Sequence, residues 1–335
     1  MKVLVLRFSS IGDIVLTTPV PRALKTQLNC EVHYCTKKQF ASLVTENPYI
    51  DKVFQLEDSL SALILELKKE KYDYIIDLHH NLRTLVIKNR LGVKSHSFNK
   101  LNFKKWLLVN LKIDKLPNIH IVDRYMETLK PLGIKSDNLG LDYFIPEKDE
   151  VDINWLPETH RKGFVAFAIG ANHATKKLPV KKMIQLCHQI SKPIVLLGGK
   201  DDFSIAEEVN EFFRDQGMEK MPIPVIFNGC GKFNLNQSAS LVKQASYVFS
   251  HDTGLMHIAA AFKKEIFSIW GNTVPAFGMY PYRTKFTVFE NNQLGCRPCS
   301  KIGFAQCPQK HFKCMNDLKF DFYLPDKSAK GNNKK

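Results

Sequence analysis

The sequence lacks any long hydrophobic run: no stretch approaches the roughly 18 apolar residues that a membrane-spanning helix needs. The N-terminus, Met1–Arg7, has only four apolar residues between charges, too few for a signal peptide. Apolar residues make up 44% of the chain and charged residues 24%, and this ordinary balance excludes disorder, collagen and coiled coil for most of it. We therefore expect a cytoplasmic globular protein whose 335 residues form two domains.

Acidic residues are scarce relative to basic ones. The chain has 33 Asp and Glu against 48 Lys and Arg, and its formal charge of +15 indicates an anionic partner. The excess is concentrated in Asn81–Lys115, where nine basic residues meet a single acid and are interleaved with Phe98, Phe103 and Trp106. Such a segment is typical of a surface that binds a membrane or an anionic lipid. The alternative is a solvated basic surface whose aromatic residues belong to the core.

Short β-rich runs alternate with helix-length amphipathic segments along the whole chain. The predicted strands are 2–8, 31–35, 52–56, 72–78, 95–98, 164–169, 193–197, 225–228, 247–250, 266–270 and 286–289. The predicted helices are 19–28, 37–46, 59–69, 83–91, 122–131, 180–189, 204–214, 236–244 and 255–262. This alternation predicts βαβ units, and therefore an α/β fold of parallel sheets with helices on both faces.

The same pattern predicts two doubly wound domains in series. The first covers 1–145, a charged linker of weak periodicity covers 146–162, and the second covers 163–325. The tail 326–335, with four lysines among Gly and Asn, is expected to be disordered. Ligands of such sheets bind at the carboxyl ends of the strands, and two such domains are expected to form a cleft.

A dinucleotide-binding fingerprint is also missing, because the first strand is followed by Arg7–Asp13, which contains one glycine where that motif needs three. Gly12 permits a tight turn beside a ligand, and Ser9 and Ser10 offer hydroxyl donors. Asp13 stands where a helix begins. Its carboxylate is either a helix cap or a general base at the edge of the cleft.

A second strand-to-helix junction is His251–Ala261. Thr253 and Gly254 at the start of the helix predict backbone amides that bind a phosphate. Asp252 either caps this helix or binds a ribose hydroxyl. His257, one turn into the helix, either faces the same ligand or is an ordinary core histidine.

Two further loops follow predicted strands. The first, Gly170–Pro179, contains the adjacent lysines Lys176 and Lys177, which are point charges suited to a diphosphate or simply solvated surface. The second, Trp270–Pro275, is a glycine turn that contains Thr273 and is informative only together with the others.

The cysteines fall into two groups. Cys296, Cys299, Cys307 and Cys314 lie within 19 residues, a spacing that in a cytoplasmic protein favours a structural zinc ion over disulfides. A surface loop with free thiols explains the spacing nearly as well. The remaining four are predicted to be small core residues: Cys30, Cys35, Cys187 and Cys230.

The motifs together resemble those of one family. The segment Arg7–Asp13, the Lys-x-Leu-Pro loop, the Gly231–Leu235 turn, the block 252–261 and the Trp270–Thr273 turn occur in one order. In this combination the chain is similar to glycosyltransferase family nine, whose best-known members are ADP-heptose:lipopolysaccharide heptosyltransferases. The resemblance runs from residue 1 to about residue 320 and is most specific in 7–13 and 252–261.

The resemblance implies a GT-B fold of two Rossmann-like domains, with the acceptor on the N-terminal domain and the nucleotide-sugar on the C-terminal domain. It implies inversion at the anomeric carbon without a metal, and the chain indeed has no Asp-x-Asp pair that would hold a divalent ion. Asp13 becomes the general base for the acceptor hydroxyl. The resemblance leaves open whether Lys176 or Lys177 contacts the diphosphate, because Leu178 replaces the usual Trp. The full predicted donor site is Ser10, Gly12, Lys176, Lys177, Asp252, Thr253, Gly254, Leu255, His257 and Thr273.

The expected acceptor is an anionic glycolipid, the lipid A-linked core of lipopolysaccharide, bound on the cytoplasmic face of the inner membrane. Residues expected to contact the acceptor or the membrane are Arg83, Lys88, Lys104, Lys105 and Trp106. No nucleic acid is expected among the partners, and no cofactor is needed for catalysis.

Three other functions compete with this one. The strongest alternative is a glycosyltransferase of the same fold that uses another nucleotide-sugar donor, because nothing in the residues themselves specifies heptose. A nicotinamide oxidoreductase would suit two α/β domains but lacks the glycine fingerprint. A non-catalytic protein that binds anionic lipids would explain only the basic segment.

Overall fold

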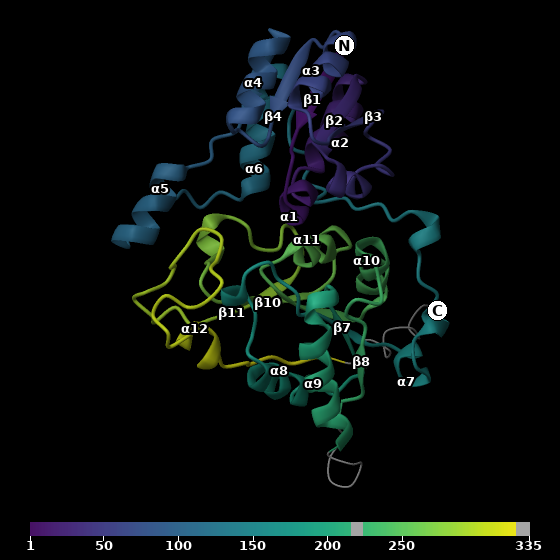
Figure 1. The fold of residues 1–335 in the computed structure, drawn as a ribbon, viewed down its shortest axis with the longest axis vertical. Helices are drawn as coiled ribbons and strands as arrows, with labels where there is room; N and C mark the ends of the chain where they lie inside the picture. The colour runs from purple at the N-terminus through teal and green to yellow at the C-terminus, as the bar shows by residue number, and fades with distance from the viewer. Residues whose placement is uncertain (216–223, 326–335) are drawn as a thin grey trace, which may run out of the picture. The chain divides into compact units, whose positions relative to one another are not determined.

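The computed structural model describes residues 1–215 and 224–325, so the predicted disordered tail 326–335 lies outside the described residues. The chain divides into two compact units (Figure 1). The first comprises Met1–Lys148, Thr253–Lys263 and Pro275–Thr284, and the second comprises Asp149–Asp252, Lys264–Val274 and Lys285–Lys335. The boundary at 148/149 falls inside the predicted linker 146–162. None of the described helices is long and apolar enough to cross a membrane.

The first unit contains a five-stranded parallel sheet in the order β3-β2-β1-β4-β5. Its strands are β1 Lys2–Leu6, β2 Glu31–Lys37, β3 Lys52–Leu56, β4 Tyr74–Asp77 and β5 Lys94–Ser97. Its helices are α1 Ile11–Val15, α2 Pro19–Leu28, α3 Leu60–Lys69, α4 Leu82–Leu91, α5 Asn102–Trp106, α6 Ile121–Met126 and α11 Gly254–Ala261. A π-helical turn, Leu107–Leu111, continues α5.

The second unit contains a six-stranded parallel sheet in the order β11-β10-β9-β6-β7-β8. Its strands are β6 Val165–Ala168, β7 Ile194–Leu197, β8 Ile226–Asn228, β9 Tyr247–His251, β10 Ile266–Trp270 and β11 Phe286–Glu290. Its helices are α7 Glu158–Arg161, α8 Val180–His188, α9 Phe203–Asp215, α10 Leu235–Gln244 and α12 Lys313–Asn316.

The central strands of both sheets are buried on their two faces, which explains the apolar runs in those strands. In β1, Leu4 and Leu6 pack with Leu63 and Leu67 of α3, and the alternate residues of β1 are equally buried. In the second sheet, Phe249 and Phe267 on neighbouring strands stack with ring centroids 4.5 Å apart. The predicted α/β fold with parallel sheets is confirmed.

All eleven predicted strands are present, and most predicted helices agree within one or two residues. The predicted helix 37–46 is wrong in type, because its described helical part is a 3-10 helix, Lys38–Leu43. The predicted helix 122–131 is α6 followed by a 3-10 helix, Glu127–Leu132, where Pro131 cannot donate to an α-helical ladder. The four cysteines predicted to be core residues are all buried.

Each sheet reverses its strand order once. In the first sheet the chain builds outward from β1 through β2 to β3, then returns to the other side of β1 with β4 and β5. In the second sheet the corresponding reversal lies between β6 and β9. The loops after these strands therefore diverge, and the carboxyl ends of β1 and β4, and of β6 and β9, are where a ligand is expected.

Candidate functional site

Asp13 lies at the carboxyl edge of the first sheet, just beyond β1. Ser10 is the N-cap of α1, and its backbone N–H and hydroxyl donate to Asp13 Oδ2 at 3.2 and 2.9 Å. The guanidinium of Arg7 pairs with Asp13 Oδ1 at 2.7 Å. The cap of this helix is thus Ser10, and the carboxylate of Asp13 is both part of the capping arrangement and the partner of a buried cation.

These contacts determine the charge of Asp13. Burial alone would raise the pKa of the carboxyl group, but the Arg7 guanidinium and the two hydrogen bonds from Ser10 outweigh it, with a smaller effect from His257, so the pKa of Asp13 is lowered. Arg7 is itself fixed by Ser9, Leu78 and Tyr125, through two carbonyl oxygens and a phenolic oxygen. At neutral pH, Asp13 is therefore a carboxylate that can accept a proton.

Helix α11 packs against α1 within the first unit, and two glycines allow the approach. A Cβ on Gly12 would lie 2.6 Å from Cδ2 of His257, and a Cβ on Gly254 would lie 2.4 Å from Cγ2 of Ile11. His257 is buried, as the core interpretation predicted, yet it lies beside the glycine that precedes Asp13. Gly12 therefore serves this close packing. Thr253 is the N-cap of α11, and Leu255 is half-buried in its first turn.

A second cluster lies at the carboxyl edge of the second sheet. Lys176 Nζ, in the loop after β6, pairs with Asp252 Oδ2 after β9 at 2.6 Å. Thr273, after β10, donates its hydroxyl hydrogen to the same Oδ2 at 2.9 Å. The fold thus brings three predicted donor residues together at the reversal between β6 and β9.

Lys177 points to a different carboxylate. Its Nζ pairs with Asp202 Oδ1 at 2.5 Å, while Asp202 Oδ2 accepts the backbone N–H of Gly199 at 2.9 Å. Of the two lysines that the sequence could not separate, Lys176 is the one that shares a carboxylate with Thr273.

Arg297 supports this cluster, and the sequence did not single it out. Its buried guanidinium donates to the carbonyl oxygens of Trp270, Gly271 and Thr273, and pairs with Glu290 at 3.1 Å. The turn that holds Thr273 is therefore fixed by a side chain from the cysteine-rich loop. The signal that could have indicated it is a lone arginine between two cysteines, Cys296 and Cys299, which is weak by itself.

The cysteine-rich loop is largely irregular. Cys296, Cys299 and Cys307 are partly exposed, and Cys314 is buried. Among residues 1–215 and 224–325, the one group of three or more potential metal ligands with ligand atoms within 4.8 Å of one another is elsewhere, and contains no cysteine. The zinc site stays a prediction.

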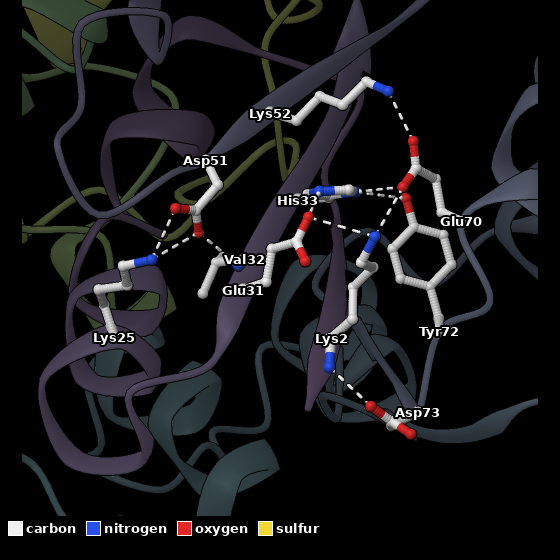
Figure 2. A network of polar contacts seen from close by, with 10 residues as sticks. All are labelled: Lys2, Lys25, Glu31, Val32, His33, Asp51, Lys52, Glu70, Tyr72 and Asp73. Carbon is white, nitrogen blue, oxygen red and sulfur yellow. Dashed lines mark hydrogen bonds and ion pairs between the residues drawn. The ribbon is translucent and has the colours of Figure 1, made fainter.

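That group is Glu31, His33 and Glu70, at the amino ends of the strands in the first sheet (Figure 2). A cation is already present there, because Lys2 Nζ lies 2.8 Å from Glu70 and 3.2 Å from Glu31. Lys52 also pairs with Glu70. Two lysines neutralise the carboxylates, so we interpret the cluster as a structural ion network that joins β1 and β2 to the end of α3.

In the basic segment Asn81–Lys115, some of the predicted contact residues form ion pairs or ring contacts within the protein, and others are exposed. Lys88 Nζ pairs with the buried carboxylate of Asp77 at 2.9 Å and donates to the hydroxyl of Ser97, so its contact with the acceptor stays a prediction. Arg83, Lys104 and Trp106 are exposed, as is Phe103, which stacks on Trp106. Lys105 is half-buried over the ring of Phe277. The interpretation of all these aromatic residues as core is wrong, although Phe98 is buried.

Comparison with known proteins gives one consistent result. Residues 60–311 match the model of glycosyltransferase family 9 (heptosyltransferase). The chain is 24% identical over 307 residues to lipopolysaccharide heptosyltransferase 1 of Campylobacter coli, covering 82% of this chain and 84% of that protein.

Solved structures share the fold. A family 9 glycosyl transferase from Veillonella parvula superposes with a TM-score of 0.68 at 22% identity, covering 86% of this chain and 85% of that one. The E. coli ADP-heptose lps heptosyltransferase II gives a TM-score of 0.67 at 19% identity, covering 95% and 98%. The GT-B fold is therefore established, while the segment Arg7–Asp13 lies outside the range of the family match.

Proposed function

Because the chain belongs to glycosyltransferase family 9 (heptosyltransferase), we propose that it transfers a heptose from ADP-heptose to a lipopolysaccharide core acceptor. The transferred heptose is inferred from the name of the Campylobacter coli relative, and the ADP-heptose donor from the name of the E. coli structure. The observation that carries the proposal is the pair of polar clusters at the two strand-order reversals. One unit has the ion pair of Asp13 with buried Arg7, and the other has Lys176, Asp252 and Thr273.

The two clusters suit the two halves of the reaction. A hydroxyl oxygen of the acceptor attacks the anomeric carbon, and its proton passes to the carboxylate of Asp13. The bond between the anomeric carbon and the β-phosphate oxygen breaks, and ADP leaves with the electron pair. Attack from the face opposite the leaving group inverts the anomeric carbon, and Lys176 offsets the negative charge that develops on the diphosphate.

The nucleotide and the sugar are tested with a donor panel. Purified protein is incubated with a deacylated, heptose-free lipopolysaccharide core precursor and with ADP-heptose, a UDP-sugar or a GDP-sugar, and nucleoside diphosphate release is measured. We expect acceptor-dependent release of ADP from ADP-heptose, because the E. coli heptosyltransferase II that shares the fold is named for that donor. Release of UDP or GDP instead would contradict the heptose assignment.

We also propose that the exposed side chains of Arg83, Phe103, Lys104 and Trp106, together with the half-buried Lys105, here called the basic surface, meet the anionic acceptor and the membrane that carries it. Exposed aromatic side chains beside basic ones suit an interface of anionic head groups and acyl chains.

Reversal of Lys104 and Lys105 to Glu tests this surface. We expect weaker binding to vesicles that contain anionic lipid, by about 1 kcal/mol for each charge lost near the surface, with unchanged ADP affinity. The matched control reverses Lys68 and Lys69, an adjacent exposed pair at the end of α3. Equal losses in both double variants would show that total charge, and not this surface, governs binding.

A further inference from the structure

His79 lies where a ligand of the first sheet is most expected. The strand order reverses between β1 and β4, and ligands of open parallel sheets bind outside the carboxyl ends of the strands at such a reversal. Asp13 follows β1, and His79 follows β4 by two residues. The two residues therefore belong to the two loops that flank the reversal.

Contacts fix His79 close to the Arg7–Asp13 pair. Its ring packs edge-on against Phe8, with centroids 5.5 Å apart, and its backbone N–H donates to Asp77 Oδ1 at 3.1 Å. The guanidinium of Arg7 contacts both the carboxylate of Asp13 and the carbonyl oxygen of Leu78. The side chain of Arg7 thus links the carboxylate of Asp13 to Leu78, the residue that precedes His79.

The ring of His79 has an unused polar atom. Its Nδ1 is buried and has no hydrogen-bond partner within the described part of the chain. Burial, together with the charges of Arg7 and Lys100, lowers the pKa of His79 to about 4, against the opposing effect of Asp13 and Asp77. The ring is therefore neutral at neutral pH, and its Nδ1 can form one hydrogen bond as either donor or acceptor. A buried polar atom without a partner is unfavourable unless a ligand or water supplies one.

We propose that Nδ1 of His79 binds a hydroxyl group of the sugar acceptor and so positions the acceptor against Asp13. This inference rests on the proposed function. A hydroxyl group both donates and accepts, so it matches either tautomer of the neutral ring. Deprotonation of the reacting hydroxyl stays with Asp13, and His79 orients the sugar that carries it.

The test compares three substitutions of His79. His79→Leu removes both ring nitrogens, His79→Asn keeps a polar atom near the position of Nδ1, and His79→Gln places its amide near the position of Nε2. ADP release from ADP-heptose is measured against the concentration of the deacylated core precursor and, separately, of the donor. His96→Leu is the matched control, because His96 belongs to β5 of the same sheet and stacks on Tyr74.

We expect His79→Leu and His79→Gln to raise the acceptor KM by about tenfold, the effect of one lost hydrogen bond, with the donor KM unchanged. His79→Asn and His96→Leu should keep the acceptor KM of the wild type. The split between the two KM values and the rescue by Asn separate positioning from a structural role.

An unchanged acceptor KM in folded His79→Leu overturns the inference, as does an equal rise of both KM values. If His79→Leu fails to fold, the comparison of His79→Gln with His79→Asn decides, and equal acceptor KM values for those two variants overturn it. Wild-type protein without acceptor-dependent ADP release would instead overturn the proposed function itself, before any variant is compared.

Discussion

Asp13→Asn is expected to lower acceptor-dependent turnover by about 10²–10⁴-fold, the usual contribution of a general base, while ADP affinity stays unchanged. Asparagine has nearly the size of aspartate and can still accept hydrogen bonds from Ser10, but it cannot take up the proton of the acceptor hydroxyl. Turnover is measured as ADP release at saturating donor and acceptor, and ADP affinity by calorimetry. Near-wild-type turnover in Asp13→Asn would show that Asp13 is not the base.

The substitution also breaks the ion pair with buried Arg7, so stability needs its own control. Asp137→Asn provides it, because Asp137 pairs with the equally buried Arg22 at 2.7 Å in the same unit. Both variants should melt at lower temperature than the wild type, but only Asp13→Asn should lose turnover. A similar loss of turnover in both would assign the effect to stability instead of proton transfer.

The pH profile gives an independent check on the same residue. Since the net effect of Arg7 and Ser10 is to lower the pKa of Asp13, the carboxylate form persists as pH falls through the usual aspartate range. In the wild type, loss of this base therefore contributes no decline in kcat/KM between neutral pH and about pH 4. If kcat/KM of the wild type fell above about pH 4 and this fall were absent in Asp13→Asn, the result would contradict the lowered pKa that the ion pair with Arg7 gives to Asp13.

The strands could be predicted from the sequence because burial on both faces leaves an unbroken apolar run, as in Val3–Leu6 and Ile194–Leu197. Short helices could not, because five residues such as those of α1 carry too little periodicity, and their start depends on the local bonds of Ser10 and Asp13. The 3-10 helix at Lys38–Leu43 shows the same limit, since its apolar residues suit an α-helix equally well.

The site could be predicted only as a list of residues. Position after a strand indicated Asp13, Lys176 and Asp252, because carboxyl ends of parallel strands share one edge. The partner of each lysine could not be predicted, because it depends on which segments the fold brings together. Asp252 is 76 residues from Lys176 in the sequence. Lys88 of α4 forms its ion pair with Asp77, the last residue of β4. His79 escaped notice because only the fold shows that its ring nitrogen is buried without a partner.

The adjacent lysines allow the donor site to be tested with a built-in control. Lys176→Met is expected to lower turnover by about 10²–10³-fold, the usual effect of removing one group that stabilises developing negative charge, and to weaken ADP binding. Lys177→Met removes the same charge from the same loop and frees another carboxylate, Asp202, yet should leave both quantities near wild type.

The two variants can be compared because each lysine pairs with one aspartate, Lys176 with Asp252 and Lys177 with Asp202, and the two aspartates have different further hydrogen-bond partners. Asp252 also accepts from Thr273 at the carboxyl edge of β10, whereas Asp202 accepts from the backbone of Gly199. Removing Lys176 therefore alters the cluster at the strand-order reversal, and removing Lys177 alters a loop beside it. Equal losses in the two variants would mean that the loop needs both charges for its own stability. A larger loss in Lys177→Met, with normal melting in both, would transfer the phosphate contact to Lys177 and require that it leave Asp202 when ADP binds.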